Sequence, residues 1–268
     1  MIAALLTVVL IVALTTSIGR AEDTKKVLLL GQKRDHPAGS HEYVPGLNVL
    51  AKSLQGVPGL ELSIHDADEP WPEGPELIAG ADAIVMFLGQ GSRWEQLDPR
   101  RLKALQQLAA RGGGIVGIHW AIGGKDAKYI PIHLQLMGGC HGGPDRKYIV
   151  TKTPIDVNVV LPRHPITTGV GDFRVKEEFY YRLKFAKQGT VRSLLTAQIE
   201  GNTETAAWAF ERPDGGRSFG FGCMHYHSSW GLVPCRRLIA QGLLWTLKLP
   251  IPKDGLPVEI TEEDLKLE

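Results

Sequence analysis

The stretch IVGIHWAIG, residues 115–123, decides the fold class. It begins with a short continuous apolar run, which is typical of a strand buried on both faces of a parallel sheet. This run ends in His119, and Gly117 stands two residues before that histidine. A small residue at that distance from a polar residue at a strand end is the pattern of a nucleophile elbow. An imidazole is a poor acyl-transfer nucleophile but a good metal ligand or general base, so one of these roles is predicted for His119.

Strands and helices alternate around this stretch. Short apolar runs predict strands at residues 26–31, 60–64 and 82–89. Apolar residues at helical spacing predict helices at residues 44–54 and 100–111. Asp98 is a good N-cap and Pro99 suits the first helical position. This order predicts an α/β fold with a doubly wound, mostly parallel sheet of the flavodoxin-like type.

The second half of the chain has a different pattern. It predicts β additions to the core and a closing helix: strands 148–152, 157–160, 193–199, 206–211 and 217–223, and helix 235–247. We therefore expect one α/β domain over residues 22–249, followed by a polar C-terminal tail over residues 250–268.

The N-terminal segment is apolar from residue 2 to residue 18, and small residues precede Glu22 at a favourable cleavage spacing. Residues 1–21 are therefore predicted to be a signal peptide, with an uncleaved N-terminal anchor as the alternative. Either interpretation predicts an exported protein, periplasmic or extracellular. Membrane contact is expected only through this segment, if it is uncleaved.

Composition excludes several classes of function. The 30 basic and 29 acidic side chains are well mixed and give a net charge of +1, so no nucleic-acid partner is expected. Gly89-Gln90-Gly91 lacks the third glycine of a dinucleotide fingerprint, and no phosphate-binding GxxxxGK[ST] is present, so no nucleotide cofactor is predicted. Three cysteines do not make a disulfide framework, and Cys223 is expected to be a buried free thiol.

Histidines gather after predicted strands. The chain has nine, and seven of them are candidates for a pocket: His36, His41, His119, His133, His141, His225 and His227. Ligands of doubly wound sheets bind outside the carboxyl ends of the strands, so several of these loops are expected to converge there. His225 and His227 are two residues apart and could place both imidazoles on one face, which is suggestive of a metal site.

The segment KEEFYY, residues 176–181, combines two carboxylates with two phenols. In an extended segment alternate residues share a face, so Glu178 and Tyr180 are expected to point together, with Glu177 and Tyr181 opposite. A carboxylate beside a phenol suits acid–base work, metal ligation or binding of sugar hydroxyls, whereas a solvated acidic edge is the alternative.

The joint order of these motifs resembles the ThuA-like (trehalose utilisation) family across residues 26–248. The matching pieces are Gly31 with His36 and His41, Gly117-Ile118-His119, Gly138-Gly139, HPITTG at 164–169, EEFY at 177–180, Trp208, GRSF at 216–219, His225 and Trp230. The resemblance implies a fold similar to the class I glutamine amidotransferase core and a role in the use of trehalose and related disaccharides, through 3-keto sugars.

Three departures from the family pattern affect the site. Glu177-Glu178 stands where Asp-Glu is usual, and His141 is displaced relative to the histidine that follows the Gly-Gly pair. Met224 replaces a glycine before the late histidine, so His225 and His227 compete for one role. Class I glutamine amidotransferases, in contrast, carry a cysteine at the elbow where this chain carries His119, which argues against a glutaminase.

These observations give a first hypothesis, an enzyme that acts on a disaccharide or 3-keto sugar as a metal-assisted lyase, hydrolase or isomerase. Its candidate residues are catalytic His119, Glu178, Tyr180 and His225, substrate-binding His36, His41, Trp120, Glu177 and Trp230, and, as ligands of zinc or a similar divalent metal, His119, His225 and His227. His36 and His41 are expected at the rim of the pocket. The expected partner is a small-molecule carbohydrate.

Two rival hypotheses come from other classes. A non-catalytic sugar-binding module would stack sugar rings on loop tryptophans, for which Trp71, Trp94, Trp120 and Trp230 are candidates. An amide hydrolase would use Cys140 as its nucleophile, but the sequence fixes no base near that thiol.

Overall fold

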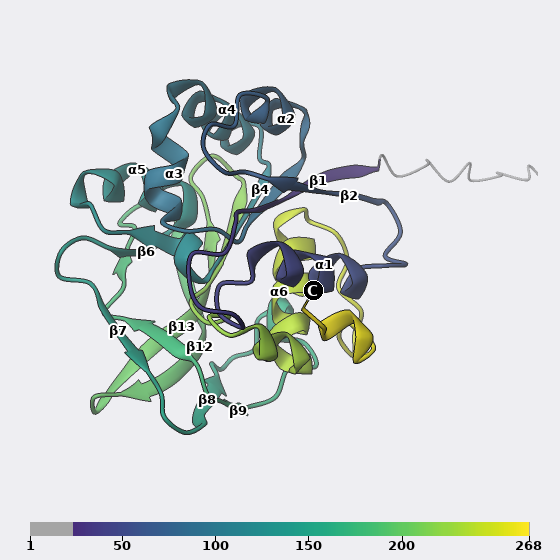
Figure 1. The fold of residues 1–268 in the computed structure, drawn as a ribbon, viewed down its shortest axis with the longest axis vertical. Coiled ribbons are helices and arrows are strands. Elements are labelled where there is room, and N and C mark those ends of the chain that lie inside the picture. Colours follow the sequence, from purple (N-terminus) through teal and green to yellow (C-terminus); the bar gives the residue numbers. More distant parts are fainter. Residues whose placement is uncertain (1–23, 268) are drawn as a thin grey trace, which may run out of the picture.

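The computed structural model describes residues 24–267 of the 268-residue chain (Figure 1). The predicted signal peptide lies outside the described residues. No helix within residues 24–267 combines the length and the apolar character that crossing a membrane requires.

The parallel half of the main sheet confirms the predicted fold class. Five parallel strands lie side by side in the order β2-β1-β3-β4-β14: β1 (Lys25–Gly31), β2 (Leu60–Asp66), β3 (Ala83–Met86), β4 (Gly114–Ile118) and β14 (Arg217–Phe221). The first four strands have the order of a flavodoxin-like sheet, with β14 in the place of the fifth strand. Their carboxyl ends therefore meet at one edge.

Helices cover both faces of these strands (Figure 1). One face carries α1 (Tyr43–Ser53) and α6 (Val233–Thr246), which pack with Leu29 and Val116 in the larger core. The other face carries four helices, which pack with Leu30 and Ile84: α2 (Gly74–Gly80), α3 (Gly91–Leu97), α4 (Pro99–Ala110) and α5 (Ile130–Met137). Each strand thus alternates its side chains between two apolar layers.

The predicted β additions are present. Four antiparallel strands extend the sheet beyond β14: β13 (Asn202–Glu211), β12 (Thr190–Ile199), β8 (Ile155–Val159) and β9 (Phe173–Val175). Two small sheets stand beside it: β10 (Glu178–Tyr181) with β7 (Lys147–Val150), and β5 (Gly123–Gly124), β6 (Gly139–Gly142) and β11 (Lys184–Phe185). The β10 strand carries the acidic-aromatic motif toward the carboxyl edge.

Local sequence signals explain the helix that was predicted best. Asp98 caps α4 by accepting a hydrogen bond from the Arg100 backbone N–H at 2.8 Å, and Pro99 occupies the first turn. Gly112, with φ of 80°, follows the helix in the left-handed region that glycine adopts without strain. The short helices α2, α3 and α5, of seven to eight residues, were not predicted, because their apolar positions span only two turns.

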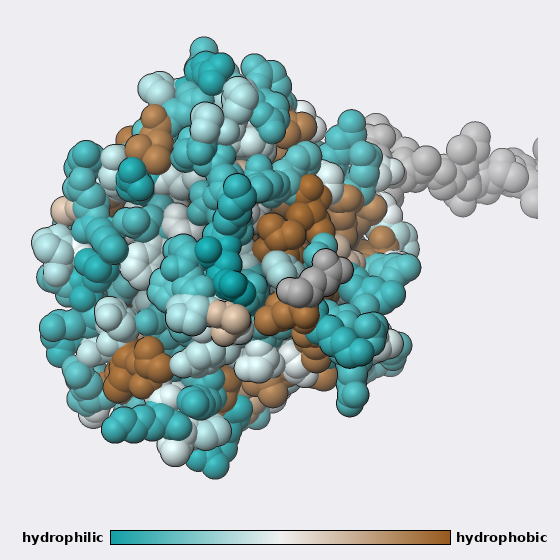
Figure 2. All heavy atoms as spheres, in the orientation of Figure 1, coloured by the Kyte–Doolittle hydropathy of each residue, from teal (hydrophilic) through white to brown (hydrophobic). Residues whose placement is uncertain are grey.

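The C-terminal segment packs against the domain instead of leaving it as a tail. Arg236 and Arg237 donate to the carbonyls of Val258 and Leu256 at 3.2 and 2.7 Å, and Gln241 accepts from the Leu256 N–H. Figure 2 shows hydrophobic side chains gathered where this segment meets α1. Cys140, Cys223 and Cys235 are all buried free thiols, as was expected for Cys223.

His164, in the HPITTG motif, predicts how the stability of the protein depends on pH. His164 Nδ1 accepts the Ile166 N–H at 3.2 Å, and burial, then Arg192 and Arg217, lowers the His164 pKa from 6.5 to about 4. The unfolded chain therefore takes up this proton at higher pH than the folded chain, so the free energy of unfolding falls as pH drops from 6.5 toward 4. His164→Asn keeps a capping oxygen and removes the titration.

We expect urea unfolding at pH 7 and pH 4.5 to show a smaller loss of stability for His164→Asn than for the wild type. An equal loss in both proteins would show that the pH dependence arises elsewhere.

Candidate functional site

The elbow after β4 is present and is strained as a nucleophile elbow is. His119 has φ of 53°, in the left-handed region that residues with a Cβ rarely adopt. A Cβ at Gly117 would lie 2.8 Å from Met137 Cε, so a larger residue there would have to displace the end of that methionine side chain. His119 Nδ1 donates to the Gly222 carbonyl at 3.1 Å, because that oxygen can only accept. The lone pair of Nε2 is therefore directed away from the backbone into the site.

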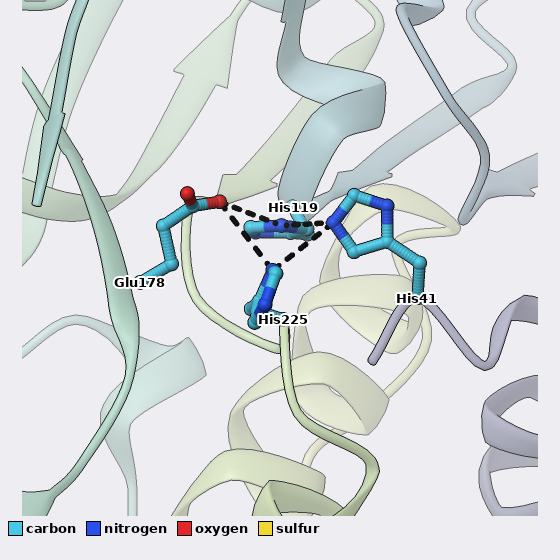
Figure 3. A group of neighbouring side chains, drawn as sticks. All are labelled: His41, His119, Glu178 and His225. Atoms are coloured by element: carbon cyan, nitrogen blue, oxygen red, sulfur yellow. Dashed lines mark hydrogen bonds and ion pairs between the residues drawn. The ribbon is translucent and has the colours of Figure 1, made fainter. Parts of the chain in front are cut away.

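Four buried side chains converge at this point (Figure 3). His41 Nε2 lies 3.1 Å from His119 Nε2 and 3.1 Å from His225 Nδ1. Glu178 Oε2 lies 3.3 Å from His119 Nε2 and 3.5 Å from His225 Nδ1. All four ligand atoms lie within 4.8 Å of one another. Glu178 and His225, exposed by 6% and 8%, are the only members of this cluster with solvent contact.

Four separate segments supply the cluster. His41 comes from the loop after β1 and has φ of 50°. Its backbone N–H donates a hydrogen bond to the backbone carbonyl of His225 at 2.9 Å. Glu178 begins β10, and His225 follows β14 behind Met224, whose φ is 88°. Strand ends and one added ribbon thus place three imidazoles and a carboxylate around one point, as Figure 3 shows.

Asp35 fixes the orientation of His41. Its Oδ1 lies 2.7 Å from His41 Nδ1, 3.0 Å from His36 Nδ1 and 3.2 Å from the Tyr43 hydroxyl, which donates to it. Because a carboxylate only accepts, His41 carries its proton on Nδ1, and Nε2 presents a lone pair. Hydrogen bonds from His41 and His36 hold the Asp35 pKa below its usual value, although burial opposes them.

The four ligand atoms fit a divalent metal ion. Bonds of about 2.0–2.1 Å in a tetrahedral zinc site place neighbouring ligand atoms about 3.3–3.4 Å apart. The four measured separations run from 3.1 to 3.5 Å. The Asp35–His41 pair also has the carboxylate–histidine arrangement that orients metal-binding imidazoles. Three imidazoles and one carboxylate are a suitable donor set for zinc.

Protonation in the cluster favours ligation. Burial lowers the pKa of His41 from 6.5 to about 4, against the opposing bond to Asp35, so its ring is neutral near pH 7. Burial would raise the Glu178 pKa, but the neighbouring imidazoles of His119 and His225 hold it well below its usual value, so Glu178 is ionised. Burial and the nearby Glu178 charge raise the pKa of Tyr180, which keeps its proton.

Tyr180 lies between two imidazoles. Its ring stacks on His119 with centroids 4.7 Å apart and on His141 with centroids 3.8 Å apart. Its hydroxyl lies 3.1 Å from His119 Nε2. Glu178 and Tyr180 therefore point into the site together, as their alternation in β10 predicted. Within the described residues, neither ring nitrogen of buried His141 makes a hydrogen bond, nor does Trp120 Nε1.

Glu177 points to the opposite side and anchors the loop that carries His225. Its carboxylate accepts from the N–H groups of His225 and Tyr226 at 3.0 and 3.4 Å, and from Ser229 Oγ. Glu177 is fully buried, and burial raises its pKa. Its place is behind the loop, so it positions His225 instead of facing the pocket where substrate contact was expected.

The remaining candidates lie at various distances from the cluster. His41 lies at its centre instead of at the rim, where only His36 remains exposed. The structure does not bring His227 to the cluster, because its Nε2 bonds the Leu265 carbonyl at 3.2 Å. Trp230 is fully buried and packs on Phe87, with centroids 5.8 Å apart.

Most of the side chains on which the two rival hypotheses depend are buried. Trp71 and Trp94 are exposed by only 3% and 2%, so among the four candidate tryptophans only Trp120 is partly exposed. Cys140 is fully buried, and burial raises the pKa of its thiol to about 12. His133, which was also a candidate, pairs with buried Glu95 at 2.9 Å.

Sequence reasoning missed Asp35 and did not place His41 at the centre. Both lie in the loop 32–42, which brings two histidines and this aspartate together after a strand end. The carboxylate–histidine pairing of metal sites was the available signal, because Asp35 stands next to His36.

The comparisons with known proteins agree on family and fold. A family model described as trehalose utilisation, ThuA, matches residues 26–246. No curated protein matches the chain. A putative ThuA-like protein from Parabacteroides merdae has a TM-score of 0.65 at 16% identity and covers 92% of this chain and 100% of its own. A putative ThuA-like protein from Bacteroides uniformis has a TM-score of 0.63 at 17% identity, covering 84% and 91%.

A third structure, described as a cytoplasmic protein from Salmonella typhimurium, has a TM-score of 0.54 at 17% identity and covers 84% of this chain and 97% of its own. At these identities the structural likeness shows a shared fold and no shared function.

The Asp35–His41 pair predicts the metal affinity of one variant. Asp35→Asn removes the carboxylate that orients His41, so we expect zinc to bind about 10–100-fold more weakly, measured by competition with a chelating dye. Asp156→Asn, at an exposed carboxylate on β8, should bind zinc as the wild type does. Equal zinc affinities for all three proteins would contradict the assigned role of Asp35.

The Glu177 anchor predicts a loss of stability. Glu177→Ala leaves buried N–H groups without an acceptor, so we expect the free energy of unfolding to fall by about 3 kcal/mol. Glu61→Ala, at an exposed position of β2, should change it by less than about 0.5 kcal/mol. Urea unfolding of both variants measures the difference, and a Glu177→Ala variant as stable as Glu61→Ala would contradict the anchor.

Proposed function

Because the chain belongs to the trehalose-utilisation (ThuA) family, we propose that it is an exported enzyme of carbohydrate metabolism that acts on a disaccharide or 3-keto sugar through a metal site. The family supports the carbohydrate-related role. The metal ligands in this proposal are His41, His119, Glu178 and His225.

One observation supports the metal site above the others. His41 Nε2 and His119 Nε2 lie 3.1 Å apart and face the same point, because each ring bonds an oxygen behind it through Nδ1. His225 Nδ1 and Glu178 Oε2 face that point as well. Both His41 and His119 are completely buried. A divalent cation at that point would be bound by all four atoms.

The chemistry follows from the groups around this point. When bound, a divalent metal supplies a Lewis acid that polarises a carbonyl or hydroxyl oxygen of the sugar. Tyr180 keeps its proton at neutral pH and can deliver it to an oxygen of a sugar bound beside His119. Glu178 engages the imidazoles through Oε2, which leaves Oε1 to accept a proton from a sugar hydroxyl or C–H.

Substrate would reach the centre from the side of Glu178 and His225, the two partly exposed ligands. Trp120, close to Tyr180 with ring centroids 5.9 Å apart, can border the bound sugar. Export is proposed from the apolar residues 2–18 and the small residues that precede Glu22.

A turnover experiment tests the proposal. Purified protein is expected to hold about one zinc per chain and to convert 3-keto-trehalose, whereas His119→Ala and Glu178→Gln lose metal affinity and at least about a hundredfold in kcat. His65→Ala, on β2 and bonded to Ser63, is a matched histidine control that should retain both properties. Metal analysis and product chromatography give the two readouts.

Two outcomes would contradict the proposal. If wild-type protein binds no divalent metal and converts no 3-keto disaccharide with or without added zinc, the enzymatic proposal is wrong. If it binds trehalose tightly without turnover, and His119→Ala changes neither property, the chain is a sugar-binding module.

A further inference from the structure

A second recess lies beside the metal cluster, next to Asp35, at the point where the strand order reverses. A cavity of about 170 Å³ opens between the loops that follow β1 and β3, and Gln32, Asp35, Gly89 and Gln90 line it. In doubly wound sheets this reversal is where ligands bind. At about 30 Å³ for each water molecule, the cavity has room for about five or six waters, which is enough for one small ring.

Asp35 belongs to both the cavity and the metal cluster. Its three hydrogen bonds, with His36, His41 and Tyr43, all use Oδ1. Its Oδ2 makes no hydrogen bond to any residue of 24–267 and stands beside Gly89, where an added Cβ would be 3.2 Å away. One oxygen therefore orients a ligand of the cluster, and the other remains available to a molecule in the cavity.

The cavity also contains free donors. Gln90 accepts from the Lys125 N–H through Oε1 at 3.4 Å, which leaves its Nε2 group to donate. The guanidinium of Arg93 is exposed and forms no ion pair within residues 24–267. The Gln32 amide accepts from the Gly89 N–H and donates to the Ala67 carbonyl, so it is held in place where it lines the cavity.

The charges exclude an anion. Asp35 and Glu69 both line the cavity, and among the described residues Arg93 is the single cation in its lining. Glu69 pairs with the buried guanidinium of Arg101 at 2.5 Å. One free carboxylate oxygen and two donor groups instead match neighbouring hydroxyls, each of which can donate one hydrogen bond and accept others.

We infer that this cavity is a subsite for an uncharged polyhydroxyl ring, the second ring of the disaccharide whose first ring is placed at the metal cluster. The inference rests on the proposed function and adds a substrate of two rings to it. Asp35 lies between the two subsites, contacting one ring through Oδ2 while it holds His41 through Oδ1.

The test is calorimetric titration of the protein with trehalose, carried out as purified and again after chelation. Arg93→Ala removes a donor and Leu97→Trp narrows the cavity from its exposed edge, so each is expected to weaken trehalose binding about tenfold in both forms. Arg174→Ala, an exposed arginine on β9, is the control and should bind as the wild type does. Zinc affinity should be unchanged in all three variants.

Several results would overturn the inference. These are trehalose affinities within twofold of wild type for both cavity variants, no binding of trehalose by the wild type, and saturation by inorganic phosphate in place of trehalose. The wild type could also bind no zinc while Arg93→Ala and Leu97→Trp still weaken trehalose binding. That result would overturn the proposed metal site and support the subsite.

Discussion

Three buried imidazoles and one carboxylate converge on a single point in this molecule, and the surrounding structure holds them there. His41 and His119 each bond an oxygen behind the ring through Nδ1, at Asp35 and at the Gly222 carbonyl, so their Nε2 atoms meet 3.1 Å apart. Polar groups in a dry interior cost free energy unless each has a partner, and the side chains of His225, Glu178 and Tyr180 surround this pair. The fold holds the arrangement by strain and by burial together.

That constraint explains the unusual backbone around the cluster. His41, His119 and Met224 all have positive φ, at 50°, 53° and 88°, and each lies in or beside a segment that supplies a ligand. Strained backbone persists where the surrounding structure over-determines it, and it is concentrated at functional sites. Glu177 provides part of this support, because its buried carboxylate holds the loop of His225 from behind.

The antiparallel additions supply one of the four residues of the cluster. A parallel sheet alone brings strand-end loops to one edge, which accounts for the three imidazoles. The carboxylate comes instead from β10, a strand outside the main sheet whose partner is β7. Glu178 and Tyr180 share one face of that strand, so a single extended segment delivers both the charged ligand and the proton-bearing phenol.

The sequence by itself determined the doubly wound sheet, the elbow at His119 and the joint direction of Glu178 and Tyr180. These follow from apolar runs, from the spacing of Gly117 and His119, and from the twofold alternation of a strand, all of which are local. Only the tertiary structure decided that His41 is central, that His225 and not His227 joins it, and that Asp35 orients the site. Those choices depend on loops 78 to 184 residues apart meeting at a sheet edge, and no local periodicity encodes which side chain of a loop turns inward.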